Sequence, residues 1–224
     1  MKKLLFISFT VLIMTLSSCK QESKETALSI PFEKYTLPNG LTVIINEDHS
    51  DPIAAVAVYY HVGSSREVPG KTGFAHLFEH MMFQRSENVG EDELFKNIME
   101  AGGTLNGSTS QDRTNYYQVV PKNAIEMVLW MESDRMGYLE NTVTKAAFVN
   151  QQNVVQNEKR QGVDNVAYGF EEYLVLKNLF PEGHPYSWDV IGDMNDLTNA
   201  TVEDVKAFHR KFYSPNNATL VISG

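Results

Sequence analysis

Residues 73–81 read Gly-Phe-Ala-His-Leu-Phe-Glu-His-Met and contain the pattern H-x-x-E-H at His76, Glu79 and His80. At about 100° per residue, these three side chains share one face of a helix. Two imidazole rings one turn apart can bind one metal ion, with a carboxylate beside them as general base. The pattern therefore predicts a helix over residues 73–83 with two metal ligands and a catalytic glutamate. An ordinary helix with partly exposed histidines is the alternative, which the strongly apolar surroundings disfavour.

A third ligand must come from another segment, because a catalytic zinc usually keeps three protein ligands and one open position. Spacing alone does not identify it. Any carboxylate qualifies, and so do the remaining histidines: His49, His61, His184 and His209. Each of these histidines, taken by itself, is more typical of a surface or capping residue. Zinc is expected from the ligand types rather than from the spacing.

Composition excludes several classes of protein. Hydrophobic residues make up 42% and charged residues 21% of the 224-residue chain, which is typical of a globular protein and not of collagen, disordered or multi-span membrane chains. A single cysteine rules out an intramolecular disulfide framework and a cysteine-based zinc finger. The net charge of −9 argues against nucleic acid as a partner, because phosphate binding favours a basic face.

The first residues are typical of an export signal. Lys2 and Lys3 precede an apolar run over residues 4–16, which is too short for a spanning helix. Residues 16–19, Leu-Ser-Ser-Cys, resemble the bacterial lipobox, in which the cysteine is lipidated and becomes the mature N-terminus. An ordinary secretory signal that happens to contain a cysteine is the alternative. The sequence predicts lipidation at Cys19.

Three parts of the chain follow from this interpretation. A lipoprotein signal peptide covers residues 1–18, a polar tether covers residues 19–30, and a folded domain covers residues 31–224. We expect a bacterial cell-envelope protein, exported and lipid-anchored to a membrane, on its periplasmic side or at the outer membrane.

Hydrophobic patterning in the folded domain mixes hairpins with helical pairs, which predicts an α+β fold with a mostly antiparallel sheet flanked by helices. Strands are predicted over residues 35–37, 41–45, 53–62, 104–109, 114–120 and 218–223. Helices are predicted over residues 73–83, 92–101, 124–138, 145–160, 170–179 and 201–213. The continuous apolar run over residues 53–62 indicates a buried strand.

Five segments carry a resemblance to a known family: residues 38–41 (PNGL), 73–81, 102–107 (GGTLNG), 153–158 (NVVQNE) and 213–217 (YSPNN). From residue 35 to residue 224 the chain resembles the N-terminal domain of the pitrilysin/insulinase family of zinc metallopeptidases, the group with the inverted zinc motif. The resemblance implies one half of a metallopeptidase clamshell built from two homologous halves.

Roles for individual residues follow from the resemblance. It implies that His76, His80 and Glu158 bind one zinc ion per chain and that Glu79 is the general base. A solvated charge on a polar helix face is the alternative for Glu158. The resemblance also implies that an edge strand binds the substrate peptide through its main chain, with Asn106 and Gly107 at the contact.

The resemblance has two departures. Gln151 stands where the family usually has a second glutamate, seven residues before the third ligand and on the same side of the helix. Gly107 stands where alanine is more usual. For the glycine pair at residues 102–103, a simple helix stop is the alternative to a substrate strand.

Two hypotheses result. The chain ends at Gly224, where the family would continue, so the domain is expected to be incomplete at its C-terminal end. The first hypothesis is a zinc endopeptidase that hydrolyses peptides or unfolded polypeptides and needs a second peptidase half. The second is a non-catalytic metal-binding or partner subunit of a peptidase-like complex, which Gln151 favours.

Overall fold

The computed structural model describes residues 29–224, and residues Pro31–Gly224 form one compact unit. The predicted signal peptide, Cys19 and most of the predicted tether lie outside the described residues. Within residues 29–224, no helix combines the length and apolar character that crossing a membrane requires.

A six-stranded sheet forms the base of this unit, with strand order β1-β2-β6-β3-β5-β4. The strands are β1 (Glu33–Thr36), β2 (Thr42–Asn46), β3 (Ile53–Tyr60), β4 (Thr104–Thr109), β5 (Thr114–Pro121) and β6 (Ala218–Ser223). All neighbours pair antiparallel except β2 and β6, which are parallel. The predicted α+β class with a mostly antiparallel sheet is confirmed.

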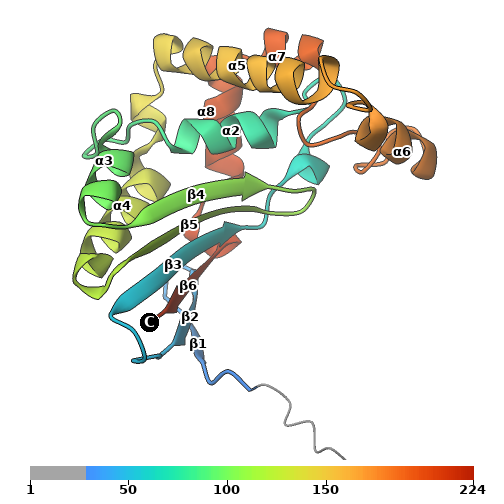
Figure 1. The fold of residues 1–224 in the computed structure, drawn as a ribbon. Coiled ribbons are helices and arrows are strands. Elements are labelled where there is room, and N and C mark those ends of the chain that lie inside the picture. The colour runs from blue at the N-terminus through green and yellow to red at the C-terminus, as the bar shows by residue number, and fades with distance from the viewer. Residues whose placement is uncertain (1–28) are drawn as a thin grey trace, which may run out of the picture. The chain divides into compact units, whose positions relative to one another are not determined.

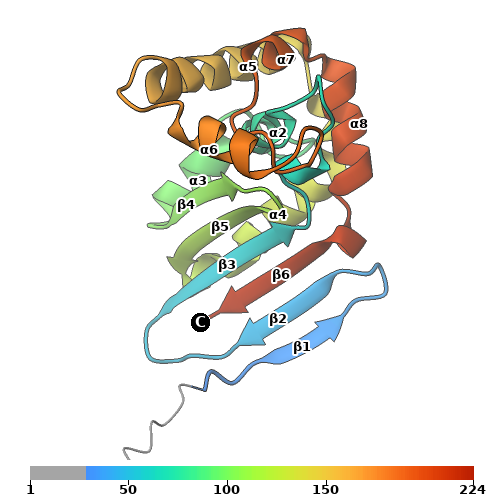
Figure 2. The same ribbon diagram turned by 90° about the vertical axis from the view of Figure 1, so that its right-hand side faces the viewer.

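All six predicted helices are present, each within one residue of its predicted bounds. The helices are α2 (Phe74–Met82), α3 (Glu93–Glu100), α4 (Ile125–Tyr138), α5 (Lys145–Lys159), α6 (Glu171–Leu179), α7 (Met194–Asn199) and α8 (Val202–Phe212). The sequence did not predict α7, which has six residues, or the π-helical turn Arg160–Asp164 that extends α5. Figure 1 shows α2 lying between β4 and α5, and Figure 2 shows β1 and β2 without helical cover.

Strand β3 differs from its prediction as a fully buried strand. Val56 and Val58 are buried, whereas Ile53 and Tyr59 on the alternate positions are 49% and 41% exposed. An antiparallel sheet with helices on one side buries only one face of each strand. The apolar run therefore reflects the high strand propensity of its residues and not burial on both faces.

Helix α2 is oriented by its apolar face. Leu77, Phe78 and Met81 are at most 1% exposed and belong to the main core cluster. Full burial of each such side chain stabilises the fold by about 1.5–3 kcal/mol. Since His76 and His80 lie off this apolar face, the core holds them on the side of α2 where both rings approach Glu158 of α5.

The start of α2 is docked against the segment that leads into α7. Gly73 and Gly192 both have positive φ, 82° and 76°, and an added Cβ on Gly192 would lie 2.3 Å from the Gly73 nitrogen. The Thr72 hydroxyl donates to the Asp196 carboxylate at 2.7 Å and accepts from the Asp193 N–H at 2.9 Å. Only glycine allows the two backbones to approach this closely.

Gly192→Ala is expected to lower the free energy of unfolding by about 2–5 kcal/mol, because it adds a steric clash to the cost of a left-handed alanine. The matched control is Gly183→Ala, since Gly183 also has a positive φ of 80° but open space around it. The control should cost about 1–2 kcal/mol. Urea denaturation measures both, and equal losses would show that the glycine contact does not matter.

Candidate metal centre

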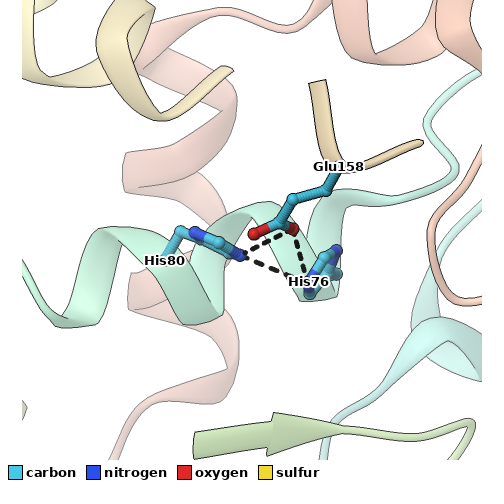
Figure 3. A group of neighbouring side chains, drawn as sticks. All are labelled: His76, His80 and Glu158. Atoms are coloured by element: carbon cyan, nitrogen blue, oxygen red, sulfur yellow. Dashed lines mark hydrogen bonds and ion pairs between the residues drawn. The ribbon is translucent and has the colours of Figure 1, made fainter. Parts of the chain in front are cut away.

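Helices α2 and α5 bring three possible ligands together. The Nε2 atoms of His76 and His80 are 3.3 Å apart, and Glu158 Oε2 lies 3.7 Å from the first and 3.3 Å from the second. Figure 3 shows both rings on α2 pointing toward the carboxylate that descends from α5. Glu158 thus reaches the two histidines although it lies 78 positions after His80 in the sequence.

The spacing of the three ligand atoms fits a zinc ion. Zinc binds histidine nitrogen and carboxylate oxygen at about 2.0–2.2 Å in tetrahedral geometry, which separates ligand atoms by roughly 3.3–3.5 Å. The three observed separations lie at or near this range. Two nitrogens and one oxygen also form a typical donor set of a catalytic zinc site, with a fourth position left open.

The other histidines stand elsewhere. Within residues 29–224, one cluster of histidine and acidic side chains has ligand atoms close enough to share an ion, and it consists of the three residues above. His61 contacts the Arg66 guanidinium, His184 stacks on an aromatic ring, and His209 is buried behind α2. His49 is exposed in the loop after β2. None of these joins the candidate centre.

The surroundings of His76 favour a neutral ring. Burial, together with the smaller effect of the nearby His80, lowers the pKa of His76 to about 4. A neutral imidazole presents a nitrogen lone pair, which is the form that binds a metal. The other ring nitrogen, Nδ1, is buried and has no hydrogen-bond partner among the described residues. Nε2 is therefore the ring nitrogen that faces the other two candidate ligands.

Glu79 lies beside the three possible ligands and faces the same cavity as His76 and Glu158. Its side chain is buried, and its Oε2 accepts a hydrogen bond of 2.6 Å from the Thr109 hydroxyl. Burial raises the pKa of Glu79, and the negative charge of Glu158 raises it further, while the Thr109 hydrogen bond and the charge of His80 oppose this. A carboxylate with a raised pKa is a stronger base, which suits a group that accepts a proton.

Two cavities flank the candidate centre. The first, of about 430 Å³, extends from Glu79 and Thr109 toward α6 and the segment around Asp189. The second, of about 420 Å³, is lined by Asn106 and Gln151 as well as by the candidate ligands. Gln151 is 8% exposed and lies on α5, two turns before Glu158, as its spacing predicted.

Among the strands of residues 29–224, β4 pairs only with β5 and is an edge of the sheet. Asn106 is exposed there, and its side-chain Oδ1 accepts a hydrogen bond of 2.8 Å from the Gly107 N–H. Gly107 itself lies beside Glu79, because an added Cβ would be 3.0 Å from Glu79 Oε1. Both residues predicted to bind substrate are thus next to the candidate centre.

The sequence analysis missed Glu67. This buried carboxyl group accepts hydrogen bonds from the N–H groups of Ala75 at 2.7 Å and Gly73 at 3.1 Å, at the start of α2. It serves as a helix cap supplied from outside the helix. No spacing pattern marks it, because the loop that carries it returns to the helix only in the folded chain.

Comparison with known proteins identifies the family. The sequence model described as Insulinase (Peptidase family M16) matches residues 42–175, more than half of the chain. The chain belongs to peptidase family M16. A second model of the same family, the Peptidase M16 inactive domain, matches residues 199–224. The resemblance stated from the sequence motifs is confirmed.

Individual M16 relatives support the same fold. The chain is 33% identical to the zinc protease PqqE of Helicobacter pylori over 100% of this chain and 49% of that protein. The crystal structure of a protease from Helicobacter pylori superposes with a TM-score of 0.83 and 33% identity, covering 87% of this chain and 46% of the other. The first half of the periplasmic protease PqqL from Escherichia coli matches with a TM-score of 0.77 and 23% identity, over 88% and 43% of the two chains. This M16 chain therefore spans about half the length of these relatives.

Glu67 makes the stability of this M16 domain depend on pH. Burial raises the pKa of Glu67 from its ordinary value of 4.5 to about 8, against the hydrogen bonds from Ala75 and Gly73. Between these values the folded state holds a proton that the unfolded state releases, so stability falls as the pH rises. Glu67→Gln removes this titration.

The difference in unfolding free energy between Glu67→Gln and wild type should therefore shift in favour of the variant from pH 5 to pH 8. Urea denaturation with EDTA present measures it without interference from bound metal. A difference that stays constant across this range would contradict the prediction.

Proposed function

We propose that this M16 chain is the metal-binding half of a zinc-dependent metalloendopeptidase that hydrolyses peptide bonds in peptides or unfolded polypeptides. The observation that supports the proposal is the meeting of His76, His80 and Glu158 at ligand spacing, with Glu79 beside them in one cavity. A structural ion pair would not need a second carboxylate there, nor the two flanking cavities.

Each of the four residues has a distinct role in the proposal. His76, His80 and Glu158 would hold one zinc ion. When bound, zinc would lower the pKa of a water molecule and polarise the carbonyl group of the scissile peptide. Glu79 accepts the proton that the attacking water releases and later donates it to the leaving amine. The burial that raises the pKa of Glu79 suits both steps.

The edge of β4 is the proposed binding site for the substrate main chain. An extended peptide can add to this edge as a further strand, so that binding depends little on side-chain identity. The Gly107 N–H is then available only after Asn106 Oδ1 releases it. The peptide would run past Glu79, because a Cβ added to Gly107 would lie 3.0 Å from that carboxylate.

A second peptidase half is part of the proposal. This chain covers 49% of PqqE, so the rest of such an enzyme would have to supply the opposite wall of the substrate chamber. A non-catalytic metal-binding or partner subunit is the alternative, favoured by Gln151, which supplies no negative charge beside the candidate ligands.

Replacing the general base and a ligand separates the two possibilities. Glu79→Gln should retain one zinc per chain and lose cleavage by about 10²–10⁴-fold, because its amide cannot take up a proton. Glu158→Gln should weaken zinc binding at least 10- to 100-fold. Metal analysis by mass spectrometry and cleavage of fluorescein-labelled casein provide the readouts. The chain is assayed alone, where slow cleavage is expected, and with a second M16 half-domain from the same genome.

The matched control is Glu47→Gln, an exposed glutamate in the loop after β2. It should leave zinc binding and cleavage unchanged. Stoichiometric zinc without any cleavage that depends on Glu79, even with the second half present, would leave only the non-catalytic subunit.

Export and lipid anchoring complete the proposal. We infer from residues 1–19 that the chain is a lipoprotein of the bacterial cell envelope, held to a membrane through Cys19. PqqL, whose first half shares the fold, is a periplasmic protease.

Cys19→Ser should prevent incorporation of radiolabelled palmitate and move the protein from the membrane fraction to the periplasmic fraction of an expressing bacterium. The wild-type protein, analysed in parallel, should be labelled and sediment with membranes. Wild-type protein that is unlabelled and released into the periplasm would instead indicate an ordinary secretory signal.

A further inference from the structure

Glu79 is tied to a different element of the fold through one of its oxygens. The Thr109 hydroxyl, at the end of β4, donates to Glu79 Oε2 at 2.6 Å. This length is typical of a hydrogen bond from a hydroxyl to a carboxylate, which is about twice as strong as one between neutral groups. The other oxygen, Oε1, lies beside Gly107, two residues earlier on the same face of β4.

The single hydroxyl proton of Thr109 has only one good acceptor. The Thr114 hydroxyl lies directly across the hairpin at 3.4 Å, but its own proton goes to the Val62 carbonyl at 2.9 Å. Thr114 therefore offers Thr109 no proton and only a distant lone pair. The proton of Thr109 points to Glu79, which is both closer and able to carry negative charge.

Thr109 is itself held in place by the turn that follows it. The backbone carbonyls of Ser110 and Gln111 accept hydrogen bonds from the N–H groups of Ser64 at 3.1 Å and Ser65 at 2.8 Å. The tip of the β4–β5 hairpin is thus fixed to the segment after β3. Because these hydrogen bonds fix the backbone next to Thr109, its hydroxyl can orient the flexible side chain of Glu79.

Glu79 needs such a restraint. Its side chain has three rotatable bonds, and Glu158 in the same cavity carries the same charge. We propose that Thr109 is a positioning residue that holds the Glu79 carboxylate in the orientation needed for proton transfer. The inference rests on the proposed peptidase function, because it assigns Thr109 a role through Glu79. The side chain of Thr109 forms hydrogen bonds with Glu79 and Thr114 and with none of the three candidate ligands among the described residues, so its replacement should not affect zinc binding.

Two substitutions separate the hydroxyl group from the shape of the side chain. Thr109→Val keeps the shape and removes the donor, whereas Thr109→Ser keeps the donor. In the full zinc-loaded chain with its second half, Thr109→Val should lower kcat about 10- to 100-fold with KM, zinc content and melting temperature unchanged. Thr109→Ser should restore kcat to within about threefold of wild type. Thr36→Val, at an exposed strand threonine, is the matched control and should match wild type.

Crystal structures of wild type and Thr109→Val, both with zinc, provide a readout that does not require cleavage. We expect the Glu79 carboxylate to leave its wild-type position in the valine variant. A Thr109→Val variant with wild-type kcat, a serine variant as slow as the valine variant, or an unmoved Glu79 would each overturn the inference. If wild type binds zinc but cleaves nothing, the proposed function fails, and the crystal structures still decide whether Thr109 orients Glu79.

Discussion

The rotation of α2 about its own axis is the constraint on which the candidate centre depends. Leu77, Phe78 and Met81 must lie in the core, and this leaves one direction for His76 and His80. A helix turned by half a revolution would place both imidazoles in the apolar core and turn three large apolar side chains away from it. The hydrophobic effect on the opposite face of α2 thus directs the two rings toward Glu158 on α5.

Short-range patterns in the sequence predicted most of the helices and strands. Hydrophobic patterning predicted α2, α4 and α8, and the structure shows that α8 begins with a capping box in which Thr201 and Asp204 form both reciprocal hydrogen bonds. The H-x-x-E-H spacing alone placed His76, Glu79 and His80 on one helix face, because it depends only on residues one turn apart. These features are short-range, so an isolated sequence can specify them.

Features that depend on how separate segments pack together could not be predicted from local sequence patterns. Glu158 could not be selected by spacing from several acidic residues and histidines, and it was expected only through the family resemblance. Glu67 and Thr109 were missed, since each reaches its partner through a loop or hairpin that returns in the folded state. Helix α7 is too short to show periodicity.

The contact between Asn106 and the Gly107 N–H has a consequence for solubility. An open sheet edge presents unpaired backbone groups that can recruit strands of other molecules and begin aggregation. Here a neighbouring amide oxygen occupies one of these donors from within the strand. A strand from another molecule must displace that oxygen first. The edge is therefore protected at Gly107, which has no side chain to cover its own backbone.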